Sequence, residues 1–212
     1  MNFIEYKEMM KAVPFTETLT YAPALYWLHP EILPMGVVSI GDESSGIVKI
    51  PPYVDNRYGR RVPVVAVRRD AFTGHTEVTD IVLPPTLKTI PAGAFEGCSE
   101  LRRITIPKAV NAIGEGTFAG CDKLEDVYYE GTMEEWNRID ILHRKHEIEF
   151  GPLIPGTPVQ EIRAERMRHV PGNEALFACN IHFRCNCSDW DRNPVFRISA
   201  AGKDVTNFFR TM

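Results

Sequence analysis

The sequence has no long apolar run and no excess of basic residues. Its most apolar stretch, residues 21–35, is interrupted by His29, Glu31 and three prolines, so no window is long enough for a membrane-spanning helix. The formal net charge is -4, with 28 acidic against 24 basic residues. Because binding to nucleic acid or to an anionic membrane needs a basic face, this balance argues against both kinds of partner.

Catalytic and cofactor-binding signatures are also missing. The sequence contains no G-x-S-x-G, no H-E-x-x-H, no phosphate-binding loop and no G-x-G-x-x-G after a predicted strand. We therefore expect a protein that is not an enzyme and carries no cofactor or metal. We also expect it neither to bind nucleic acid nor to insert into a membrane.

The start of the sequence offers no secretory signal. It carries charge at Glu5, Lys7 and Glu8, where such a signal needs an apolar run. The expected compartment is therefore the cytoplasm, where the 5 cysteines would be reduced, and their odd number fits that expectation. If a leader precedes this sequence, the protein is secreted or displayed at a cell surface instead.

An internal repeat with a period of 23 residues runs through the middle of the chain. Residues 78–100 read VTDIVLPPTLKTIPAGAFEGCSE, and residues 101–123 read LRRITIPKAVNAIGEGTFAGCDK. The positions that match in type and phase are Val78/Leu101, Ile81/Ile104, Leu83/Ile106, Pro84/Pro107, Leu87/Val110, Ile90/Ile113, Phe95/Phe118, Gly97/Gly120 and Cys98/Cys121. Weaker matches on both sides give a degenerate repeat before these two and half a repeat after them.

Each repeat has the pattern of a short strand followed by a turn. Apolar side chains alternate toward the end of residues 101–106, as in a half-buried strand, and Pro107 ends the strand because it cannot donate to a sheet. Gly114 permits a turn. Only neighbouring coils can bury the apolar side of each coil. The expected fold is therefore a β-rich repeat solenoid with coils of about 23 residues, short strands and short helical or 3-10 turns.

Two residue types recur inside the turns. Phe95 and Phe118 occupy one phase, and Phe72 occupies the same phase upstream, so we expect the three rings to lie in one interior column. Cys98 and Cys121 occupy a second phase, where small buried side chains are expected to fill the inside of the turn.

The phrase I-x-I-P-x-x-V-x-x-I-G-x-x-x-F-x-G-C-x-x-L resembles the BspA-like (Treponema-type) leucine-rich repeat. Residues 127–139, VYYEGTMEEWNRI, are similar to the closing phrase of that family, and residues 47–67 are similar to its longer first coil. Residues 173–182 resemble a phrase that usually follows the closing phrase, displaced here by an insertion of roughly 30 residues. The resemblance covers residues 36–141 and implies adhesion or interaction roles, commonly at a cell surface.

These patterns divide the chain into three parts. Residues 1–35 are expected to cap the first coil, and residues 36–141 are expected to form the solenoid. Thr132 and Glu135 form a capping box that starts a short helix with Trp136 and Ile139 on one face. The N-terminal cap is expected to contain a helix over residues 2–13, with its apolar positions at Phe3, Ile4, Met9, Met10 and Val13.

Residues 142–212 are expected to form a C-terminal capping or accessory element. Its composition predicts a turn-rich linker at 151–158 and a helical segment at 160–169. Strands are expected at 177–183 and 195–198.

The outward side of the strands offers one candidate binding surface. In Ile81-Val82-Leu83 and Ile104-Thr105-Ile106 the middle residue points away from the core. Stacked coils place equivalent residues about 4.8 Å apart. The predicted surface consists of Lys49, Val82, Thr105 and Tyr128, flanked by Arg102 and Arg103. The alternative is a merely solvated sheet face.

The first coil offers a second candidate surface. It contains about ten extra residues around 53–62, which include Arg57 and Tyr58. A basic, aromatic loop on a rigid frame can recognise an acidic partner, so Arg57 and Tyr58 are further candidate binding residues. A hairpin with a structural role only is the favoured interpretation, because the family that the repeats resemble often has a longer first coil.

A group of possible zinc ligands lies near the C-terminus. Cys179, His182, Cys185 and Cys187 are of the right types. Their spacing, C-x2-H-x2-C-x-C, differs from that of the usual paired knuckles, and alternation along a strand would send neighbouring side chains to opposite faces. Ordinary strand cysteines are therefore favoured, and a zinc or thiol site is the alternative.

The expected function is that of a non-enzymatic module that binds another protein through the exposed strand face and the loops. The alternative is a structural subunit whose C-terminal element drives homo-oligomerisation or assembly.

Overall fold

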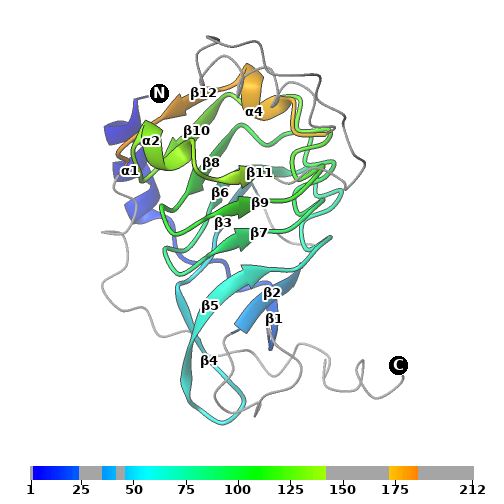
Figure 1. Cartoon of the computed structure of the whole chain (residues 1–212). Coiled ribbons are helices and arrows are strands. Elements are labelled where there is room, and N and C mark those ends of the chain that lie inside the picture. Colours follow the sequence, from blue (N-terminus) through cyan, green and yellow to red (C-terminus); the bar gives the residue numbers. More distant parts are fainter. Residues whose placement is uncertain (1, 24–34, 42–45, 142–171, 186–212) are drawn as a thin grey trace.

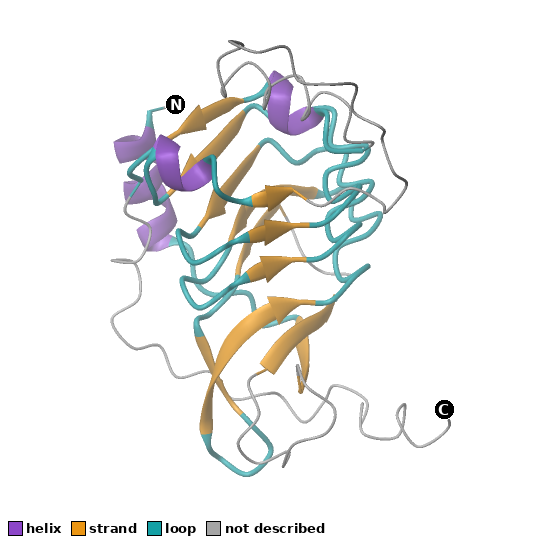
Figure 2. Cartoon of the chain, in the orientation of Figure 1, coloured by secondary structure: helices purple, strands orange, loops and turns teal. Residues whose placement is uncertain are grey.

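The computed structural model describes residues 2–23, 35–41, 46–141 and 172–185 of the chain. Its strands form two sheets with a shared core between them (Figures 1 and 2). Sheet A runs in the order β1 (Leu19–Pro23), β2 (Met35–Ile40), β5 (Arg61–Val67), β7 (Thr89–Ile90), β9 (Ala112–Ile113) and β11 (Asp140–Ile141), with β4 (Tyr53–Asp55) paired to β5 beside this path. Sheet B runs in the order β12 (Asn180–His182), β10 (Asp126–Tyr129), β8 (Arg103–Ile106), β6 (Val78–Val82) and β3 (Gly46–Lys49).

Equivalent strands of successive repeats pair in parallel. In sheet B, Ile81 lies opposite Ile104, which lies opposite Val127, so each partner is 23 positions further along the chain. In sheet A, Ile90 lies opposite Ile113 in the same way. A slip of one residue would turn every apolar side chain outward, so the buried face fixes this register. The predicted leucine-rich-repeat type of fold, with short strands, therefore takes the form of two mainly parallel sheets.

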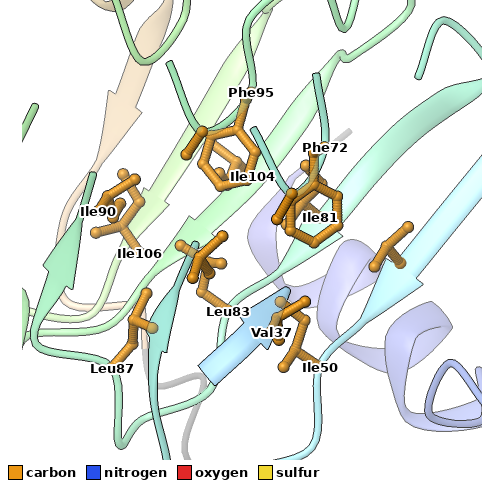
Figure 3. Packing of buried hydrophobic residues seen from close by; sticks show 14 of the residues in the cluster. Val37, Ile50, Phe72, Ile81, Leu83, Leu87, Ile90, Phe95, Ile104 and Ile106 are labelled. Carbon is orange, nitrogen blue, oxygen red and sulfur yellow. The ribbon is translucent and has the colours of Figure 1, made fainter. Parts of the chain in front are cut away.

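The interior column of phenylalanines is present as predicted. The ring centroids of Phe72 and Phe95 are 5.4 Å apart, and those of Phe95 and Phe118 are 5.5 Å apart. All three side chains are buried, and Figure 3 shows Phe72 and Phe95 pointing into the same core as Ile81 and Ile104. Tilted aromatic pairs at this separation stabilise a core beyond the area they bury.

Hydrogen bonds join the same turns from coil to coil. Phe95 N donates to Thr117 O at 3.0 Å. The thiols add a second contact, because Cys98 Sγ donates to Phe72 O at 3.1 Å and Cys121 Sγ donates to Phe95 O at 3.2 Å. Both cysteines are buried, as predicted, and each also bonds the preceding coil.

Gly114 is required by the close approach of two coils. A Cβ at this position would lie 2.1 Å from Ala92 N and 2.5 Å from Ala92 Cα. Gly114 is not among the glycines with positive φ. Its prediction as a residue that permits a turn is therefore corrected: the backbone of the preceding coil leaves no room for a side chain.

Helix α1 (Phe3–Ala12) confirms the helix predicted near the N-terminus. It begins with a capping box, in which Asn2 Oδ1 accepts a hydrogen bond from Glu5 N at 2.9 Å and Glu5 Oε2 accepts one from Asn2 N at 3.3 Å. Ile4 is 73% exposed, so its predicted place on the buried side is wrong. The buried stripe begins one position earlier and leaves Ile4 on the outer side of the helix.

Helix α1 lies outside the two sheets, along the outer face of sheet B (Figure 2). Its stripe consists of Phe3, Tyr6 and Met10, with spacing i, i+3 and i+7. The helix contacts Tyr128 of β10 near its start and Lys49 of β3 at its end. It therefore crosses the strands of sheet B. The sequence had instead predicted that this segment covers the open end of the first coil.

The first end of the stack is extended by two more strands. β1 pairs antiparallel with β2, and β2 pairs parallel with β5. These strands add Leu19, Tyr21, Met35 and Val37 to the core. This part of the N-terminal segment therefore continues sheet A.

The predicted capping-box helix follows the last repeat. In α2 (Met133–Trp136), Thr132 Oγ1 accepts from Glu135 N at 3.2 Å, and Glu135 Oε2 accepts from Thr132 N at 2.8 Å. Trp136 and Ile139 are both buried, as predicted. The chain then enters β11, which pairs parallel with β9.

The segment 172–185 adds a further strand to sheet B. β12 pairs parallel with β10, and Ile181 lies opposite Val127. Residues Ala175–Ala178 form helix α4, so the strand predicted from residue 177 begins later than expected. The helix places Leu176 in the core.

Several predicted segments lie outside the described residues. These are the linker at 151–158, the helical segment at 160–169 and the strand at 195–198. Within the described part of the chain, no helix has the length and hydropathy needed to cross a lipid bilayer.

Asn173 joins the returning segment to the last complete coil. Asn173 Oδ1 accepts a hydrogen bond from Phe118 N at 3.1 Å, and Asn173 Nδ2 donates to Gly114 O at 2.9 Å. The side chain is fully buried. It therefore supplies the hydrogen bonds that a further coil would otherwise give to these two backbone groups.

We predict that Asn173→Ala lowers the free energy of unfolding by about 1–3 kcal/mol, because the buried Phe118 N loses its acceptor and Gly114 O keeps only the bond from Thr117 Oγ1. The exposed neighbour Glu174 gives a matched control, and Glu174→Ala should change stability by less than about 0.5 kcal/mol. Urea unfolding followed by circular dichroism measures both variants. Equal stabilities for the two would contradict the closing role of Asn173.

The buried thiols predict a loss of stability at alkaline pH. Burial raises the pKa of Cys98 and of Cys121 from the ordinary 9.0 to about 12. Above pH 9 the unfolded chain releases protons that the folded chain keeps. The thiol contribution is therefore fully present below pH 9 and is lost as the pH rises toward 12. The loss should approach about 1.4 kcal/mol per pH unit for each thiol.

A double variant, Cys98→Ser with Cys121→Ser, isolates this effect. Serine keeps a hydrogen-bond donor and does not titrate in this range. The free energy of unfolding of the double variant, measured from urea curves over the same pH window, should fall less steeply with rising pH than that of the wild type. Parallel pH profiles for the two proteins would show that the thiol pKa is no higher in the folded state than in the unfolded state.

Candidate functional site

The four strand residues predicted to form a binding surface lie side by side. Lys49 is opposite Val82, Val82 is opposite Thr105, and Thr105 is opposite Tyr128. All four are buried. The expectation that they form an open surface is therefore wrong, because helix α1 covers this face of sheet B.

An aromatic stack holds helix α1 on the sheet. The Tyr6 ring is stacked on Tyr128, with centroids 4.6 Å apart, and the Phe3 ring lies 5.3 Å from Tyr128. His182 of β12 stacks against Tyr128 at 4.9 Å. Burial raises the pKa of Tyr128 to about 12, so its hydroxyl stays neutral. Sequence reasoning missed Tyr6, although the spacing of positions 3, 6 and 10 carried the signal.

Lys49 holds the other end of the helix. Its Nζ donates to Met10 O at 3.2 Å and to Val13 O at 3.4 Å, and it lies 4.6 Å from the centroid of the Phe15 ring. The last carbonyls of a helix have no partner within the helix and carry partial negative charge. Lys49 therefore serves as a cationic cap for α1.

The two arginines on the flank of the predicted surface differ in accessibility. Arg103 Nε lies 2.6 Å from Asp80 Oδ1, a buried carboxylate, and the guanidinium lies 5.4 Å from the Tyr6 ring centroid. Arg102 is exposed and lies 3.7 Å from Glu125. An exposed ion pair of this kind contributes little to stability. Arg102 is therefore the one exposed member of the six predicted strand-face residues, and Arg103 is partly buried.

The candidate zinc ligands make other contacts. Cys179 Sγ donates to Leu176 O at 3.6 Å, and Cys185 Sγ donates to His182 O at 3.5 Å. His182 Nε2 lies 2.8 Å from Asp126 Oδ1. Burial raises the pKa of Cys179 to about 11 and of Cys185 to about 12, which disfavours the thiolate that zinc binds.

No group of three or more His, Cys, Asp or Glu side chains able to hold a metal ion occurs within the ranges that the structure describes. Cys187 lies outside those ranges. The same holds for most of the C-terminal element that the alternative assembly role would use.

The extra residues of the first coil form a β-hairpin. β4 and β5 pair antiparallel, with Tyr53 opposite Pro63 and Asp55 opposite Arg61. The hairpin projects beyond the stacked strands (Figure 1). Arg57 and Tyr58, the predicted binding residues, are both exposed at its tip. We call residues 53–62 the Arg/Tyr hairpin.

Two tyrosines of the Arg/Tyr hairpin are paired with guanidinium groups. The Arg57 guanidinium carbon lies 4.8 Å from the Tyr58 ring centroid, and one of its nitrogens donates to the Tyr58 hydroxyl at 2.6 Å. The Arg61 guanidinium carbon lies 4.7 Å from the Tyr53 ring centroid. Tyr58 is 50% exposed and Tyr53 is 38% exposed. The hairpin therefore presents flat aromatic and cationic groups to solvent.

Asn56 locks the turn of this hairpin. Its Oδ1 accepts hydrogen bonds from Tyr58 N and Arg60 N, each at 3.0 Å, and Asn56 N donates to Arg60 O at 2.8 Å. Gly59 has a φ of 70°, which favours glycine. Asn56 is a residue that the binding prediction missed; an asparagine three residues before glycine in a polar loop was the available signal.

Comparison with known proteins supports the resemblance seen in the repeats. Residues 63–138 match a family model described as "BspA type Leucine rich repeat region (6 copies)". The predicted resemblance to BspA-type leucine-rich repeats is thereby confirmed for this segment. No match was found among curated proteins.

Several solved bacterial structures are similar to about half of the chain. A leucine-rich repeat protein from Bacteroides ovatus ATCC 8483 is 30% identical, covering 53% of this chain and 30% of its own, with a TM-score of 0.43. The T. pallidum leucine-rich repeat protein is 22% identical, covering 57% and 55%, with a TM-score of 0.45. A leucine-rich repeat protein from Bacteroides capillosus ATCC 29799 is 22% identical, covering 53% and 78%, with a TM-score of 0.46.

Proposed function

We propose that the BspA-type leucine-rich repeat at residues 63–138 is the scaffold of a non-enzymatic module that binds another protein. The coils of about 23 residues stack as a solenoid, whose rigid frame holds loops in fixed positions. Leucine-rich-repeat scaffolds commonly serve in protein interactions, and the continuous buried column of Phe72, Phe95 and Phe118 supports such rigidity here.

The docking surface in this proposal is the Arg/Tyr hairpin. The sequence had predicted the strand face of sheet B as the docking surface, but α1 covers that face. The observation that carries the proposal is the exposure of Tyr53 and Tyr58 beside guanidinium groups on a hydrogen-bonded turn. Tyrosine and arginine are the residues most often found at the centres of protein interfaces. A preformed turn also lowers the entropy lost on binding.

The partner segment in this proposal is acidic. The hairpin carries three arginines against one aspartate within a chain of net charge -4. The Arg57 and Arg60 side chains are exposed and form no ion pair with a carboxylate among the residues the structure describes. Planar guanidinium groups bind carboxylates through paired hydrogen bonds, and the local positive field would steer an acidic segment to the tip.

Charge reversal at the hairpin tests this function. We predict that Arg57→Glu with Arg60→Glu weakens binding of the native partner protein at least tenfold, or about 1.4 kcal/mol. Arg138→Glu, at an exposed position after α2, is the matched control and should bind as the wild type does. The measurement is affinity capture from the native source by the three proteins, followed by titration of each captured protein that contains an acidic segment.

The outcomes of this experiment separate two failures. Equal binding by all three proteins would remove the hairpin as the docking surface. Capture of no protein by the wild type would contradict the binding function itself. Circular dichroism of each variant shows that the fold is retained.

A further inference from the structure

The face of sheet B beneath α1 has an unusual composition for a buried surface. The inward side chains of its strands are apolar, as at Ile81, Ile104 and Val127. The outward positions of the same strands include Lys49, Asp80, Arg103, Thr105 and Asp126. A permanent core rarely contains such residues unless they are paired, whereas interfaces between separate proteins are about as polar as an ordinary surface. The contact between α1 and sheet B therefore has the character of a protein–protein interface.

The contacts made by α1 are those of a helix docked in a groove. Phe3, Tyr6 and Met10 are its anchors, at i, i+3 and i+7, the spacing by which grooves recognise amphipathic helices. The rings of the two aromatic anchors contact the Tyr128 ring, and Lys49 Nζ donates hydrogen bonds to carbonyls at the end of the helix. In this contact Lys49 Nζ bonds to two main-chain oxygens, which a helix of any sequence offers, and it also lies over the Phe15 ring just beyond the helix.

The dimensions of the face match one short helix. Ten residues of α-helix span about 15 Å, and the three spacings from β3 to β10 span about 14 Å. Isolated helices shorter than about 12 residues are marginally stable in water. Helix α1 therefore depends on this face for its structure, and its attachment to the chain gives it a high local concentration there.

We propose that the outer face of sheet B is a docking site for an amphipathic helix of a partner protein, and that α1 occupies this site in cis. The partner helix carries an aromatic residue at i, a second at i+3 and an apolar residue at i+7. It displaces α1 and takes over the stacking on Tyr128 and the cap from Lys49. This surface is separate from the Arg/Tyr hairpin, so neither site depends on the other.

A peptide in trans tests the proposal on the full chain. The probe is a fluorescein-labelled synthetic peptide of residues 2–18, and fluorescence anisotropy measures its binding. The full-length Tyr6→Ala protein, whose own helix has lost its stacking on Tyr128, should bind this peptide at least tenfold more tightly than the wild-type protein, in which α1 competes. Met10→Ala is a second full-length variant with the same expected gain.

Two altered peptides give the matched controls. A peptide with Tyr6→Ala should bind at least tenfold more weakly, because it lacks the ring that stacks on Tyr128. A peptide with Ile4→Ala should bind as the unaltered peptide does, since Ile4 faces solvent in the docked helix.

Three outcomes would overturn the proposal. The first is equal binding of the Tyr6→Ala peptide and the unaltered peptide. The second is that neither full-length variant binds the peptide. Unfolding of both variants counts as the same result, because it would show that α1 is an integral part of the core. The third is concentration-dependent dimerisation of the wild-type protein in light scattering, which would make a second copy of α1 the occupant.

Discussion

The parallel, in-register pairing of equivalent residues in successive repeats is the constraint on which the rest of this structure depends. It places Ile81, Ile104 and Val127 in one row and the rings of Phe72, Phe95 and Phe118 in one column. Each coil buries an apolar side that it cannot bury alone, so neighbours stabilise one another. The thiol bonds between turns and the missing side chain at Gly114 follow from the same close approach.

Both proposed surfaces take their form from this frame. The Arg/Tyr hairpin is an insertion within one coil, and its antiparallel pairing carries the tip away from the stack. Sheet B instead aligns equivalent outward residues into one face, which is about as wide as a short helix is long. One surface is therefore open in this structure and the other is occupied by the chain itself, so the two proposals can be tested separately.

The sequence was most informative where a pattern repeats and least informative where contacts join distant segments. Period and phase were enough to predict the phenylalanine column, the buried cysteines and the capping box before Trp136. They could not show that α1 covers sheet B, because the position of a helix on a sheet depends on tertiary packing. The bonds from Asn173 to the coil around Phe118 cross a gap of 55 residues, so no local signal predicts them. At the candidate site, Arg57 and Tyr58 were predicted to be exposed and are, whereas Lys49 and Tyr128 were mistaken for surface residues.

The central claim is that equivalent residues of successive coils touch in the interior. Nuclear Overhauser contacts between the ring protons of individually labelled phenylalanines test it most directly. The structure predicts contacts between Phe72 and Phe95 and between Phe95 and Phe118, in the order of the coils. Absence of both contacts, in a protein whose circular dichroism shows it folded, would contradict the stacked repeat and every surface derived from it.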